Sequence, residues 1–164
     1  MGLDVAIIEN GNGGDFQIGS NDLRTIFSIE NQVYLAWFGG NKKEVTQVGK
    51  TKAQSFDYWA NNLLFGDIPS QQFNSLTEST LDKVAVNSEG RTILESAMKK
   101  DLEYMRDDIG AEVTVNLSII SDDRWKAVVK IILPTGDEKI IIVTFRKVSV
   151  GDFWYLDFND DFFV

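Results

Sequence analysis

The sequence contains no cysteine and no histidine among its 164 residues. Without these side chains the protein has no thiol nucleophile, no disulfide, no histidine-based catalytic triad and none of the usual zinc and iron ligands. Most familiar catalytic machinery is therefore excluded, and carboxylates are the acid–base groups that remain. We expect neither a cofactor nor a metal ion.

Long apolar runs are also missing. No stretch approaches the roughly 20 apolar residues that a helix needs to cross a bilayer, and the N-terminal residues lack a basic region followed by a long apolar segment. We therefore expect a soluble, unexported protein without a membrane partner. The net charge of −9 is spread along the chain and repels phosphate backbones, so we expect no nucleic-acid partner either.

The composition predicts one folded domain over residues 1–164. Hydrophobic residues make up 43% and aromatic residues 12% of the chain, which places it well outside the range of disordered sequences. A chain of this length buries a substantial core but is too short for two full domains.

The first forty residues predict a small hairpin followed by a helix. Two short apolar stretches between residues 4 and 18 flank an Asn/Gly cluster, which can supply the positive φ angles of a hairpin turn. Apolar residues then recur at helical spacing until Gly39–Gly40. We expect this helix to begin at Ser20 or Asn21 and to be followed by an exposed loop over 41–54.

The second half predicts helices followed by strands. One helix covers Phe73–Val84, and another begins at Asn87–Ser88 and closes at Gly110 with an apolar stripe of Leu94, Ala97, Met98, Leu102, Met105 and Ile109. Residues 111–121 and 125–133 alternate between apolar and polar around a turn at Asp122–Asp123. A third strand covers 139–147 and is so apolar that we expect both of its faces to be covered, and residues 151–164 offer a fourth strand.

These elements predict an α+β fold. It consists of an N-terminal hairpin and about three helices packed on one face of a C-terminal antiparallel meander of three to four strands. No parallel crossover is required.

Paired carboxylates are the one feature that favours an enzyme, because glycoside hydrolysis uses two of them. The acidic residues in the helical stretches are Glu78, Glu89, Glu95, Asp101 and Glu103. No pair of them stands in an apolar setting that would raise one pKa, so we expect these carboxylates to lie on solvated faces.

The segment SFDYWANNLLFG at 55–66 is unusually rich in aromatic and apolar residues for a region where the chain turns. Such residues either fill an irregular part of the core or form a protein–protein interface, where aromatics and amides are typical. Apolar side chains near the C-terminus pose the same choice. The predicted partner-binding residues are Tyr58, Trp59, Asn61, Asn62, Phe65, Phe158, Phe162 and Phe163.

Several strings together resemble a known family. They are DVAIIENGNGGDF near the start, the helix ending VYLAWFGG, the Trp-Ala-Asn-Asn cluster at 59–62, LEYMRDDIGAEVTV, and the LPTG of the meander. In this order they resemble the small baseplate proteins of Mu-like contractile-tailed phages and prophages, relatives of a wedge protein labelled lysozyme-like. The Glu-Pro-Arg signature of the lysozyme-like branch is absent.

The resemblance implies a non-enzymatic structural role. The protein would be made in the bacterial host cytoplasm and would then sit in the tail baseplate in multiple copies, with six expected, beside other wedge proteins and the sheath. Arms of the sheath would add strands to the edges of its sheet. Two alternatives stay open: a peptidoglycan-cleaving muramidase that uses paired carboxylates, and a monomeric binding module whose Trp59 cluster and C-terminal phenylalanines are fully buried within one chain.

Overall fold

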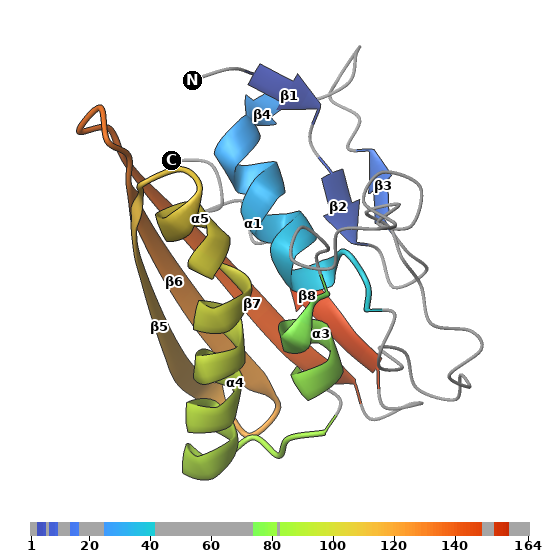
Figure 1. Ribbon diagram of the computed structural model, residues 1–164. Helices are drawn as coiled ribbons and strands as arrows, with labels where there is room; N and C mark the ends of the chain where they lie inside the picture. The colour runs from blue at the N-terminus through green and yellow to red at the C-terminus, as the bar shows by residue number, and fades with distance from the viewer. Residues whose placement is uncertain are drawn as a thin grey trace.

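The structure is a computed structural model, and it describes residues 3–5, 7–9, 14–16, 25–41, 74–81, 83–148 and 153–157. Its centre is a four-stranded antiparallel sheet in the order β5–β6–β7–β8, and helices lie on one face of this sheet (Figure 1). The predicted α+β fold is confirmed. The four strands are β5 (Glu112–Ser121), β6 (Arg124–Ile132), β7 (Glu138–Val148) and β8 (Phe153–Asp157). The helices are α1 (Ser28–Phe38), α3 (Leu76–Leu81), α4 (Ser88–Asp101) and α5 (Glu103–Asp107).

Two small strand pairs precede the first helix. The hairpin expected over residues 4–18 corresponds to β2 (Ile7–Glu9), which pairs with β3 (Gly14–Phe16). A second pair, β1 (Leu3–Val5) with β4 (Thr25–Phe27), was not predicted.

The predicted start of the first helix is wrong. Thr25–Phe27 form β4, and α1 begins at Ser28 rather than at Ser20 or Asn21. The triplet Thr25–Phe27 is β-branched and aromatic, and pairing with the distant β1 outweighs its place in a helical pattern. The Asn31 side-chain amide then donates to the Val5 carbonyl at 2.7 Å and holds the helix start against β1. The predicted end is confirmed, since α1 stops at Phe38 and Gly40 has a φ of 89°.

The helix predicted over 87–110 is interrupted. The helix α4 begins at Ser88 as expected, and Asn87 caps it, because the Asn87 side-chain oxygen accepts the Gly90 N–H at 2.8 Å. At Leu102, however, the chain leaves helical geometry, and the Leu102 N–H bonds to the Lys99 carbonyl before α5 begins. Most of the predicted stripe is buried, namely Leu94, Met98, Leu102 and Met105, whereas Ile109 is exposed. Gly110, with a φ of 74°, ends the helical region as predicted.

The strands follow the alternation in the sequence. The helix-facing side chains of β6 are all buried, and they are Trp125, Ala127, Val129 and Ile131. In β7 the buried residues Ile141, Val143 and Phe145 alternate with a face on which Ile140 is 51% exposed. The expectation that both faces of this strand are covered is therefore wrong for Ile140, which pairs with Lys130 on the side of the sheet away from the helices.

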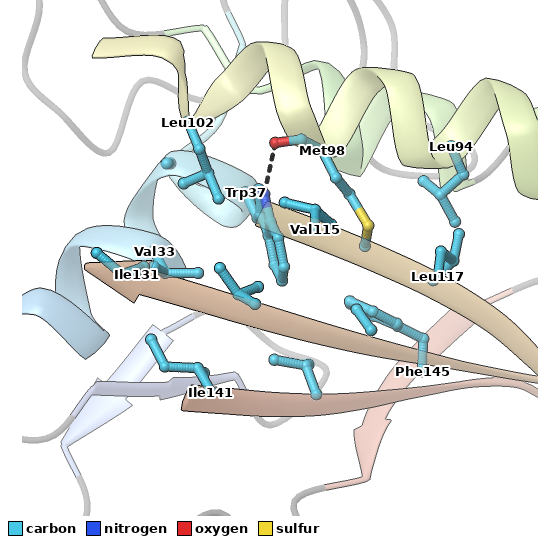
Figure 2. Packing of buried hydrophobic residues seen from close by; sticks show 14 of the residues in the cluster. Val33, Trp37, Leu94, Met98, Leu102, Val115, Leu117, Ile131, Ile141 and Phe145 are labelled. Atoms are coloured by element: carbon cyan, nitrogen blue, oxygen red, sulfur yellow. Dashed lines mark hydrogen bonds between the residues drawn. The ribbon is translucent and has the colours of Figure 1, made fainter. Parts of the chain in front are cut away.

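Trp37 lies at the centre of the core between α4 and the sheet (Figure 2). Its ring is fully buried and lies 6.2 Å from the ring of Phe145, centroid to centroid. Its indole N–H donates to the Met98 carbonyl at 3.2 Å. Carbonyls in the last turn of a helix lack a helical partner, and the N–H of Leu102, four residues on, bonds to Lys99 instead. Trp37 therefore satisfies a carbonyl that the end of α4 leaves without a helical partner.

We expect Trp37→Phe to destabilise the protein more than Trp125→Phe does. Both indoles are fully buried, but the Trp125 N–H has no hydrogen-bond partner in the described part of the chain. The Trp37 variant also leaves the buried Met98 carbonyl without its donor, which costs about 1–3 kcal/mol more. Urea unfolding of the two variants measures this difference in the free energy of unfolding, and an equal or larger loss in Trp125→Phe would contradict the role of the hydrogen bond.

Candidate docking edge

All eight residues predicted to bind a partner lie outside the described residues. These are Tyr58, Trp59, Asn61, Asn62, Phe65, Phe158, Phe162 and Phe163. The structure therefore neither brings them together nor separates them, and the choice between core and interface for the segment 55–66 stays a prediction.

The solvated-face expectation fails for Asp101, the last residue of α4. Its Oδ1 and Oδ2 accept the Leu76 N–H at 2.9 and 3.0 Å, and its Oδ2 also accepts the Thr77 N–H at 2.8 Å. Burial raises the pKa of Asp101 to about 6, against the opposing effect of these hydrogen bonds.

Asp101 acts as a helix cap. Both of its oxygens are engaged by the first amides of α3, and Ser75 adds a second cap because its Oγ accepts the Glu78 N–H at 3.1 Å. The Ser75 hydroxyl in turn donates to the Trp37 carbonyl. The hydrogen bonds of Asp101 therefore join α4 to α3.

The β5 strand forms one edge of the sheet in the described part of the chain. It spans ten residues, roughly 33 Å at about 3.3 Å per residue, and it is the outermost strand of the sheet in the described part of the protein (Figure 1). In an antiparallel pair, alternate residues direct their backbone groups away from the partner strand. The Leu117 N–H points away from β6, because it donates to the Glu95 carboxylate. By alternation, the same orientation holds for Val113, Val115 and Ile119.

The side chains along this edge alternate in character. Val115 and Leu117 are buried beneath α4, whereas Thr114, Asn116 and Ser118 are exposed on the opposite face. Toward its end β5 carries a bulge, since the register shifts between Ile119 and Ser121. Ile119 and Ile120 are 40% and 53% exposed there. The edge is thus polar along most of its exposed face and apolar near the bulge.

Glu95 reaches this edge from α4. Its carboxylate accepts the Leu117 N–H at 3.1 Å and forms ion pairs with Lys99 at 2.5 Å and Arg91 at 3.3 Å. Burial raises the pKa of Glu95, but the hydrogen bonds from Lys99 and Leu117 and the nearby cations outweigh it, so the pKa lies below its usual value. The sequence indicates the ion pairs through their four-residue spacing. Nothing in the sequence points to Leu117, which lies 22 residues away.

Comparison with family models, with curated proteins and with solved structures found no match for this chain. Within the described ranges, no group of three acidic side chains lies close enough together to hold a metal ion. None of the helices described is long and apolar enough to cross a membrane.

The raised pKa of Asp101 predicts a pH-dependent stability. A carboxyl whose pKa is raised to about 6 from 3.8 binds its proton more tightly in the folded state than in the unfolded state. This contribution is complete below about pH 4 and is lost as the pH rises through about 6. The free energy of unfolding of the wild type, relative to Asp101→Asn, should therefore fall by about 1–3 kcal/mol between pH 4 and pH 7.

Urea unfolding at a series of pH values measures this difference. Asp107→Asn is the matched control, because Asp107 is exposed and its pKa is lowered by a hydrogen bond from Arg106. The control should show no such fall over this range. A constant difference between the wild type and Asp101→Asn would mean that Asp101 does not titrate with a raised pKa.

Proposed function

We propose that this protein is a non-enzymatic assembly component that binds a partner by accepting an extended segment at the β5 edge. The open edge of β5 carries this proposal. The N–H and C=O groups that point away from β6 have no strand to pair with in the described part of the protein, and strand addition satisfies such groups.

The β5 edge suits this role better than the β8 edge does. Strand addition draws its affinity from main-chain hydrogen bonds, and β5 is ten residues long while β8 has five. The helices also hold β5 rigidly, because α4 and α5 both contact it. A partner strand would therefore meet a preformed edge, which reduces the entropic cost of binding.

The resemblance to phage baseplate proteins indicates the assembly in which the protein would act and the partners that it would bind. On that basis we place the protein in the baseplate of a contractile phage or prophage tail, with wedge and sheath proteins as partners and an extended arm of a sheath protein as the added strand. Six copies around a tail axis would multiply individually weak contacts into a stable assembly.

The arrangement of the carboxylates favours this proposal over the muramidase. A glycosidase needs two carboxyl groups roughly 5–10 Å apart, one of them free to protonate a leaving group. Asp101 has the raised pKa of such an acid, but its oxygens accept the N–H groups of Leu76 and Thr77. Glu95 is likewise engaged by Leu117 and two cations.

The test is affinity purification of the tagged protein from cells that express its neighbouring genes. Val113→Pro removes one edge N–H while replacing a partly buried side chain with another of similar size. We expect the wild type to recover tail or sheath proteins and Val113→Pro to lose at least most of them. Trp59→Ala and a chain without residues 158–164 test the predicted aromatic docking residues in the same assay.

Ser88→Pro is the matched control. Ser88 is the first residue of α4, where proline is tolerated, and the preceding Asn87 has the extended backbone that proline requires. This variant should recover partners like the wild type. Equal recovery by Val113→Pro would exclude the β5 edge, and release of cell-wall sugars by the purified protein would favour the muramidase.

A further inference from the structure

The β5 edge is compatible with the β5 edge of a second copy. If two β5 strands lay antiparallel and centred on Val115, Val113 would face Leu117 of the other copy, and Thr114 would face Asn116. Glu112 would face Ser118, so no like charges would be directly opposed. Such a pairing is isologous, with the same residues contributed by both chains.

Glu95 stands in the way of this pairing. Its carboxylate occupies the outward N–H of Leu117 at 3.1 Å, and its side chain is only 19% exposed. Lys99 and Arg91 hold the carboxylate in place from one turn on either side along α4. In a symmetric pair both copies would have to give up this hydrogen bond, and two carboxylates would lie against the new interface.

We propose that Glu95 prevents the β5 edge from pairing with a second copy of this chain and leaves the edge available for a different partner, whose strand would displace one Glu95 carboxylate rather than two. Two features of the edge oppose self-pairing, namely the charged Glu95 side chain and the bulge at Ile120. Both kinds of feature are known to prevent edge-to-edge association of sheets. The availability of the edge for a different partner rests on the proposed function, whereas the block on self-pairing does not.

The proposal predicts that Glu95→Ala associates with itself more strongly than the wild type does. Sedimentation equilibrium of the purified proteins over a wide concentration range gives the self-association constants. We expect the dissociation constant of Glu95→Ala to be at least tenfold lower. Adding Val113→Pro to Glu95→Ala should restore the wild-type value, because it removes an edge N–H from the same interface.

Glu89→Ala is the matched control. It removes a carboxylate from the exposed first turn of the same helix but leaves the contacts of Glu95 with Leu117, Lys99 and Arg91 in place, so its dissociation constant should equal that of the wild type. Amide hydrogen exchange supplies a second readout. In dilute Glu95→Ala the Leu117 N–H should exchange faster than in the wild type, and it should become protected again as the protein concentration rises.

An unchanged dissociation constant in Glu95→Ala would overturn the proposal. So would a lower dissociation constant in Glu95→Ala that stays low when Val113→Pro is added. If Glu95→Ala does not fold, Glu95→Gln replaces it, because the amide keeps an acceptor oxygen and loses the charge. The dissociation constant of Glu95→Gln is then expected to be at least threefold lower than that of the wild type. An unchanged dissociation constant in Glu95→Gln would overturn the proposal. These measurements use the purified protein alone, so they stand whether or not the partner purification succeeds.

Discussion

The hydrogen bond from the Trp37 indole to the Met98 carbonyl is the contact on which the arrangement of the helices depends. It joins α1 to the end of α4, where the chain leaves helical geometry at Leu102. The ring of Trp37 packs near Phe145 of β7, and its own carbonyl accepts the Ser75 hydroxyl at the start of α3. A single buried residue thus connects three helices and the sheet, which explains why elements from distant parts of the chain share one core.

Other polar contacts fix α3 and the sheet relative to α1 and α4. The α3 helix has only six residues, too few to be stable by itself, and it is capped by Ser75 and by Asp101 of α4. The buried Glu30 of α1 forms an ion pair at 2.7 Å with the partly exposed Lys139 of β7. With α4 fixed in this way, its outer face places Glu95 beside the middle of β5. The position of α4 therefore determines whether Glu95 can bind the Leu117 N–H at the edge of the sheet.

The contacts of the charged groups are consistent with the proposed docking role. The carboxylates with resolved contacts cap a helix, hold an edge amide or pair with neighbouring cations. Such engagement leaves them poorly placed for proton transfer, which requires an acid or base free to reach a substrate. An edge strand, by contrast, needs only a rigid position and unpaired backbone groups to bind another chain. The helices provide that position for β5 by packing on one face and leaving its outer edge to Glu95.

Local signals in the sequence determined the elements with a strong period and clear ends. The alternation in β5 and β6, the cap at Asn87 and the glycines at 40 and 110 all depend on neighbours a few residues away. Only the tertiary structure decided that Thr25–Phe27 joins a strand, that the long helix breaks at Leu102, and that Asp101 and Glu95 bind amides 24–25 and 22 residues away. These outcomes depend on partners that are distant in the chain, for which a local pattern carries no signal. The aromatic docking residues lie outside the described ranges and remain predictions of the sequence alone.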